Sequence, residues 1–189
     1  MFGLGGHKKA QSKAPWSIQI LTLDYLVDAI LQPENYALGG VDFFEQLANA
    51  AGDEDELQDV QALRFSEAHV QPAGNLATPD QTFADWELPL FEQVVAIVPR
   101  DEASLQAAQK AYSDYVNPIN AVMYAGPYLI RANVMSDDTD RDSSPFSTAQ
   151  VVPLADAVID CQLPGAKLAG YHVPWLLLNG AKLHGWAPA

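Results

Sequence analysis

Alternating apolar and polar positions, rich in β-branched and aromatic residues, run through most of this chain and are typical of β-strands. The pattern predicts strands over residues 18–21, 26–32, 61–71, 91–98, 122–124, 128–135, 151–160 and 175–183. Short breaks at Leu23-Asp24 and at Ala125-Gly126-Pro127 separate two pairs of neighbouring strands. Since such breaks favour tight turns, a β-hairpin is expected at the start of each half of the chain.

Two segments have the spacing and end signals of helices instead. Asp42 and Glu45 form a capping-box pattern before an amphipathic stretch that stops at Gly52. A second helix is expected from Asp101 to Lys110, with a good N-cap, acids in its first turn and a lysine in its last. Pro118 disfavours helix at the residue before it, so this helix should end first.

Three short motifs occur twice, in the same order, and indicate an internal duplication. The pairs are Tyr25–Leu31 with Tyr128–Val134, Phe65–Val70 with Leu154–Ile159, and Pro89-Leu90-Phe91 with Pro174-Trp175-Leu176. The offsets between partners are 103, 89 and 85 residues, so the second copy should be shorter.

The predicted fold class is mainly β (α+β). We expect two related small antiparallel domains, barrel-like or sandwich-like, with one or two short helices, because a few strands with one apolar face need to curl or pair. The expected organisation is a flexible basic tail over residues 1–16, a first β-domain over 17–100, a helical linker over 101–117 and a second β-domain over 118–189.

Two of these segments carry a resemblance. Phe43–Asn49 is similar to an apolar "LSDFLN"-type motif and Leu154–Ala157 to an "LTDA"-type strand. With the tyrosine-containing hairpins, they resemble tandem copies of a family of small bacterial β-domains of unknown function. The resemblance implies a β-domain in each half and supplies no catalytic residue.

Composition and charge narrow the function classes. The 189 residues are 49% hydrophobic with a net charge of -14 and a pI near 4.3, so a nucleic acid or an anionic membrane surface would repel the chain. No apolar run approaches the roughly 20 residues of a membrane span, and no signal-peptide pattern opens the sequence. With the single Cys161, these features predict a cytoplasmic protein without membrane insertion and without disulfides.

The sequence contains no motif for catalysis or metal binding with the required residues at the required spacing. The acidic run over residues 137–142 has Ser143 where a calcium loop needs glycine and Ala149 where it needs glutamate. The four histidines have no HxH or HExxH spacing, and no nucleophile elbow or phosphate loop is present. Cys161 has no basic neighbour to activate it, which favours a buried, inert thiol. We therefore expect no cofactor, no metal and no enzymatic activity.

Aromatic residues of the last quarter of the chain are the candidate interaction residues: Tyr171, Trp175 and Trp186. A stacking groove for nucleic acid would need surrounding Lys and Arg, which the charge balance opposes. The leading hypothesis is a noncatalytic binding or scaffolding protein that contacts a protein partner or forms a homo-oligomer. Two alternatives stay open: a small-ligand-sensing module with an interdomain pocket, and a hydrolase with loop carboxylates.

Overall fold

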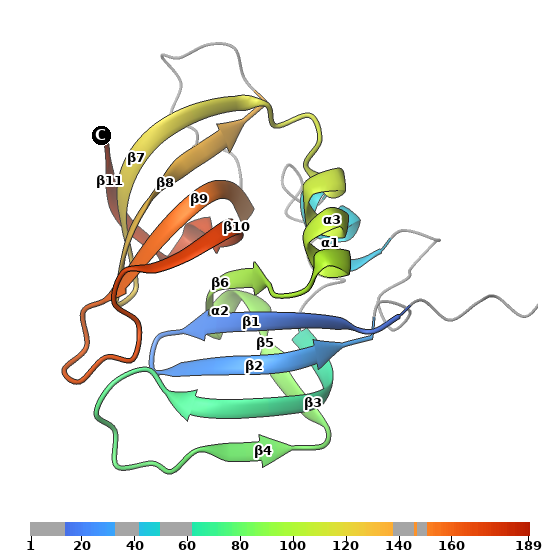
Figure 1. Ribbon diagram of the computed structural model, residues 1–189, viewed down its shortest axis with the longest axis vertical. Coiled ribbons are helices and arrows are strands. Elements are labelled where there is room, and N and C mark those ends of the chain that lie inside the picture. Colours follow the sequence, from blue (N-terminus) through green and yellow to red (C-terminus); the bar gives the residue numbers. More distant parts are fainter. Residues whose placement is uncertain (1–13, 33–41, 50–61, 138–145, 147–150) are drawn as a thin grey trace, which may run out of the picture.

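The computed structural model describes residues 14–32, 42–49, 62–137, 146 and 151–189. Its strands form one large antiparallel sheet, and short helices pack beside it (Figure 1). The predicted class, mainly β with short helices, is confirmed. The sheet is open, and it runs without interruption through both parts of the chain.

In residues 16–99, here called the first half, the described part of the chain forms six strands and two short helices. In chain order they are β1 (Trp16–Thr22), β2 (Tyr25–Leu31), α1 (Phe43–Asn49), β3 (Ala62–Pro72), β4 (Gln81–Phe83), β5 (Trp86–Pro89), α2 (Leu90–Gln93) and β6 (Val94–Pro99).

Helix α3 (Glu102–Ala111) follows, and residues 117–188 form the second half. Its elements are β7 (Asn117–Ala125), β8 (Tyr128–Ser136), β9 (Val151–Cys161), β10 (Tyr171–Asn179), a 3-10 turn η5 (Gly180–Lys182) and β11 (Leu183–Pro188).

The two halves have the same strand order. The first reads β6-β1-β2-β3, with β4 and β5 both paired to the far edge of β3, and the second reads β11-β7-β8-β9-β10. They join where β10 pairs with β6, with Leu177 opposite Ile97 and Leu178 opposite Ala96. In Figure 1 the second half lies above the first, and β11 and β4 are the two ends of the sheet.

Strand pairing also repeats residue by residue. Ile20 lies opposite Ile97 as Met123 lies opposite Trp186, and the register shift beside this pair recurs in both halves. Val70 lies opposite Val27 as Ile159 lies opposite Ile130. We call residues at the same place in this pairing pattern counterparts.

Counterparts in the two halves are separated by a nearly constant number of residues. The offset is 103 from β1 to β7 and from β2 to β8, and 89 from β3 to β9 and from β6 to β11. It is 90 from β4 and β5 to β10, the single strand that corresponds to both. Two of the three sequence matches fall in this register. The third is wrong, because Pro89 ends β5 and has Asn179 as its counterpart, whereas Pro174 lies inside β10.

Each half has an inner face that carries most of its large apolar side chains. In the first half, Val27, Phe65 and Leu88 point to this face, where α1 and α3 cover part of it with Phe43, Phe44, Ala108 and Tyr112. In the second half, the inner face is a separate buried cluster that includes the outer-face residues Leu21, Leu26 and Val98 of the first half. The outer face of the first half therefore packs into the inner face of the second, a contact we call the junction.

Both helices begin where the caps predicted. Asp42 and Glu45 exchange bonds between side chain and backbone N–H at 3.2 Å each. Asp101 accepts from the N–H of Ser104 at 2.7 Å, and the buried Ser104 hydroxyl donates to the Ser17 carbonyl at 3.1 Å. That last bond ties α3 to β1, so the segment expected as a linker packs on the first half.

Several strand predictions differ from the structure. The strand expected over 122–124 is β7, which begins at Asn117, and no strand was predicted at β4 or β5 or beyond residue 183. The strand expected over 91–98 starts at Val94, because residues 90–93 form α2. The strand expected over 175–183 is the end of β10 followed by η5, where the Asn179 side chain accepts from the N–H of Ala181 at 3.1 Å and turns the chain toward β11.

Candidate binding pocket

A pocket opens on the inner face of the first half, at the end that α1 and α3 leave uncovered. Its volume is about 210 Å³. Ten residues from β1, β2, β3, β4, β5, α2 and the β3–β4 connection line it: Thr22, Tyr25, Val70, Thr78, Pro79, Gln81, Phe83, Trp86, Leu88 and Gln93.

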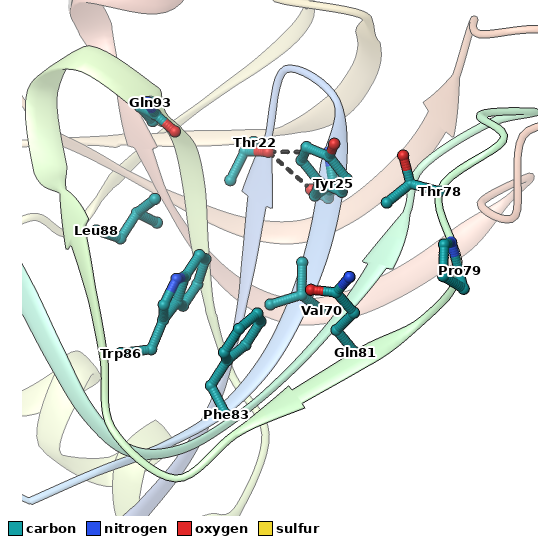
Figure 2. Close-up of a pocket in the computed structure, with 10 residues that line it drawn as sticks. All are labelled: Thr22, Tyr25, Val70, Thr78, Pro79, Gln81, Phe83, Trp86, Leu88 and Gln93. Atoms are coloured by element: carbon teal, nitrogen blue, oxygen red, sulfur yellow. Dashed lines mark hydrogen bonds between the residues drawn. The ribbon is translucent and has the colours of Figure 1, made fainter.

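Aromatic side chains form one wall of this pocket. Phe83 and Trp86 lie on either side of the break between β4 and β5 and stack with ring centroids 6.0 Å apart at 13°. Trp86 also contacts the buried Phe65, whose ring centroid lies 6.0 Å away, so the wall is held by the core beneath it. Figure 2 shows Phe83, Trp86 and Val70 pointing into the same space. The apolar character of this wall suits an apolar group as occupant.

Polar groups at the opposite wall organise the β1–β2 turn. The Thr22 hydroxyl donates to the Tyr25 carbonyl at 3.0 Å and accepts from the Tyr25 N–H at 2.9 Å (Figure 2). These bonds fix Tyr25 at the pocket wall, where its side chain is half-buried. Within the described part of the chain, no hydrogen bond of the Tyr25 hydroxyl is found.

The lining residues contain no carboxylate, histidine, lysine, arginine or cysteine. Tyr25 is the one lining residue with an ionisable side chain. General acid–base catalysis needs a side chain positioned to transfer a proton, and Tyr25 is the one such group among these ten. The pocket can bind by shape, apolar contact and single hydrogen bonds.

The same place in the second half is filled. Its counterparts to Tyr25, Val70, Phe83 and Trp86 are Tyr128, Ile159, Val173 and Leu176, all of which are buried. The β1–β2 hairpin end of the first half closes it: Leu21 and Leu26 lie in the same buried cluster, and the Tyr128 hydroxyl donates to the Thr22 carbonyl at 2.8 Å.

Gly126 brings the β7–β8 turn close to that hairpin end. A Cβ atom added to Gly126 would lie 2.9 Å from Leu23 Cδ2 and 3.1 Å from Val95 Cγ2. Its φ of +53° also favours glycine. The positive φ and the close packing against Leu23 and Val95 therefore favour glycine at this turn.

A second, more open hollow of about 390 Å³ lies between the halves, where β10 and β6 diverge. It is lined by residues 98–102, Leu105 and residues 171–174. The Arg100 guanidinium lies over the Tyr171 ring, 5.6 Å from its centroid. This hollow corresponds to the interdomain pocket of the ligand-sensing alternative.

The three candidate interaction residues do not share one surface. Trp175 is buried in the cluster on the inner face of the first half. Trp186 is half-buried on β11, with its ring centroid 5.3 Å from that of Phe146, and Tyr171 is half-buried beside Arg100. The pocket aromatics Phe83 and Trp86 are not among the residues that the sequence singled out, because they lie on strands of only three and four residues.

Further expectations from the sequence concern the acidic run, metal ligands and Cys161, and some of these residues are not described by the structure. Asp138, Asp140 and Asp142 of the acidic run lie outside the described residues, so the expectation that this run is not a calcium loop stays a prediction. Among the described residues, no group of three or more His, Cys, Asp or Glu side chains is placed to hold a metal ion. Cys161 is a buried free thiol, as predicted.

Among the ionisable groups outside the pocket, Tyr128 and Asp160 have pKa values shifted by contacts within the second half or at the junction. Burial raises the pKa of the Tyr128 phenol, in line with its place in the junction. The pKa of Asp160 is lowered, first by the Gly170 N–H that donates to it at 2.6 Å and then by Arg131, whose Nη1 donates at 2.8 Å. This carboxylate ties β9 to β8 and to the start of β10.

Comparison of the chain with protein families, with curated proteins and with solved structures gives no match. The family resemblance of the repeated motifs therefore stays an expectation. In the described part of the chain, no helix has the length and apolar character needed to cross a membrane.

Proposed function

We propose that this protein is a noncatalytic binding protein and that the pocket of the first half takes an apolar group of a binding partner. The observation that carries the proposal is the contrast between counterparts: the inner face is closed by a turn in the second half and open, with an aromatic wall, in the first. The pocket volume of about 210 Å³ is below the roughly 300–1,000 Å³ of sites for drug-sized ligands, which favours a side chain or a tight turn as the occupant.

The hollow between the halves supports a second candidate function. At about 390 Å³ it reaches the size of small-ligand sites, and Arg100, Asp101 and His172 give it charged and polar lining. This arrangement makes small-ligand sensing the alternative to the binding of an apolar group in the pocket.

NMR titration with N-acetyl-tyrosinamide, a soluble mimic of a single aromatic residue, tests the proposal. We expect saturable shifts at the amides of Tyr25 and Val70 and at the Trp86 indole, with no comparable shifts at Arg100 or His172. Replacing Trp86 by leucine, the residue at its counterpart, should weaken the probe at least tenfold, because the aromatic wall is lost.

Trp186→Leu is the matched control: it makes the same substitution at a half-buried tryptophan outside the pocket and should leave probe binding unchanged. Absence of saturable shifts at the pocket residues up to solubility would contradict the proposed function. Saturable shifts confined to the hollow would favour the alternative.

A further inference from the structure

We propose that the partner is a second copy of this chain, whose β7–β8 turn enters the pocket and whose β11 pairs with β5. This inference rests on the proposed function and names its partner. It follows from comparing the two surfaces that meet at the junction with their counterparts elsewhere in the molecule.

The first surface of the junction is the outer face of the first half, and its counterpart is exposed. Leu21 is 0% exposed at the junction, whereas its counterpart Tyr124 is 54% exposed. Val95 and Val98 are buried, whereas their counterparts His184 and Ala187 are exposed. An exposed tyrosine in the place of a buried leucine is typical of a contact surface.

The second surface of the junction is the inner face of the second half, and its counterpart is the pocket. At the junction the β1–β2 turn closes this face, and Tyr128 donates to the carbonyl of Thr22. In the pocket, Tyr25 occupies the place of Tyr128 without such a bond in the described residues. Ala125 is the counterpart of Thr22. In the proposed contact, the carbonyl of Ala125 in the second copy would accept a hydrogen bond from the Tyr25 hydroxyl.

The junction and the proposed contact differ in the sizes of the entering turn and of the wall that it meets. At the junction, Leu23 of the β1–β2 turn lies against the β7–β8 turn, where a Cβ atom on Gly126 would come within 2.9 Å of Leu23 Cδ2. The pocket residues Phe83 and Trp86 are larger than their counterparts Val173 and Leu176. In the proposed contact, Gly126 replaces Leu23 and Pro127 replaces Asp24. They meet the larger Phe83 and Trp86 of the pocket. A smaller turn and larger walls fill the same space.

Sheet edges extend the same argument. The junction pairs β10 with β6. The counterparts of β10 are β5 and its neighbour β4, which form one end of the sheet, and the counterpart of β6 is β11, which forms the other end. The equivalent register places Glu87 opposite Trp186 and Leu88 opposite Gly185 of the second copy. An unpaired strand edge presents backbone groups that a matching edge can satisfy. One difference is that Asn179, whose side chain donates to the Val94 carbonyl at 2.8 Å across the junction, has Pro89 as its counterpart.

Such a contact is head-to-tail, since the turn of one copy enters the pocket of the next. Head-to-tail contacts either close into a ring or grow into a filament. Each chain contains one junction already, so two chains joined twice would form a ring of four halves. We expect the smallest assembly to have about twice the 20.5 kDa mass of the chain.

Sedimentation velocity from about 1 to 100 µM, at about 0.15 M salt where the Debye length is about 8 Å, measures this association. We expect wild-type protein to associate and Tyr124→Asp to weaken association at least roughly 30-fold, because a carboxylate replaces an apolar contact at the centre of the interface. Val116→Asp is the matched control: Val116 is 64% exposed, lies outside both surfaces and receives the same added charge. It should associate like wild type.

Mixing two variants tests the direction of the contact. Phe83→Asp damages the pocket and keeps the turn, whereas Tyr124→Asp damages the turn and keeps the pocket. Each alone should be monomeric, and an equimolar mixture should regain one intact contact and form a heterodimer. A circular dichroism spectrum identical to that of wild type verifies that each variant is folded.

Monomeric wild-type protein at 100 µM would overturn the proposal, and so would equal association of Tyr124→Asp and wild type. Equal loss in Tyr124→Asp and Val116→Asp, or no complementation in the mixture, would also overturn it. Repeating the probe titration in Tyr124→Asp separates the two proposals, because this variant keeps a free pocket. Probe binding there, in a chain that never associates, would leave the proposed function standing and remove the second copy as partner.

Discussion

The hydroxyl of Tyr128 provides a direct energetic test of the junction. Its bond to the Thr22 carbonyl is 2.8 Å long, and the Tyr128 side chain is fully buried. Replacing Tyr128 by phenylalanine removes the donor and keeps the ring. A neutral hydrogen bond contributes about 0.5–1.5 kcal/mol net, and a buried acceptor that loses its donor costs about 1–3 kcal/mol, so we expect a loss of about 1–2 kcal/mol in the free energy of unfolding.

Tyr25→Phe is the matched control, since it makes the same change at the counterpart position, where the hydroxyl has no described bond. We expect it to change the free energy of unfolding by less than about 0.5 kcal/mol. Both variants are compared by urea unfolding in the Tyr124→Asp background, so that association does not contribute. For an m value of about 3 kcal/mol per M, Tyr128→Phe should lower the midpoint by about 0.5 M urea. Equal midpoints for the two variants would refute the assignment of this bond to the junction.

Three further predictions concern the same molecule. Gly126→Ala should lower the unfolding free energy by about 2–4 kcal/mol, because of the φ of +53° and the approach to Leu23. The control Gly170→Ala, at φ +61° with no neighbour within 4 Å, should lower it by about 1–2 kcal/mol. Equal losses in the two variants would contradict the contact between Gly126 and Leu23. Asp160→Asn should destabilise the protein at neutral pH, because the lowered pKa of Asp160 means that its charged form stabilises the fold. This difference should vanish as the pH falls below the ordinary value of 3.8, and a difference that persists in acid would contradict it. Single-stranded DNA or RNA should show no saturable binding below about 10 µM at about 150 mM salt by fluorescence anisotropy, since residues 17–189 carry seven Lys and Arg against 24 acids; tighter binding would show that local groove chemistry outweighs the charge.

Local signals in the sequence were enough to predict most of the long strands and the starts of α1 and α3, but not β4, β5 or β11. The caps at Asp42 and Asp101 predicted where α1 and α3 begin, because a side-chain acceptor at the N-cap satisfies backbone donors whatever the tertiary fold. The tyrosines at positions 25 and 128 predicted equivalent hairpins, and both open the second strand of a half. The third motif failed, since Pro89 ends β5 and Pro174 lies inside β10; a proline and two apolar residues carry no register information.

The candidate site could not be predicted from the same signals. Phe83 and Trp86 lie on strands of three and four residues, too short for periodicity to identify a face. Tyr128 is buried because the first half packs on it at the junction, whereas nothing in the described chain covers Tyr25 in the same way. This difference depends on contacts between residues far apart in the sequence, which a local pattern does not predict. Trp175, a candidate interaction residue because it is aromatic, lies in the core instead, since burying a large aromatic side chain removes a large apolar area from water.

Isotope-filtered NMR on a one-to-one mixture of labelled and unlabelled wild-type chains tests the central claim most directly. It detects contacts between protons of different copies. The account predicts intermolecular contacts from the rings of Phe83 and Trp86 to Pro127 and to the ring of Tyr124. Intermolecular contacts that join other surfaces, or none at a concentration of several hundred µM, would contradict it.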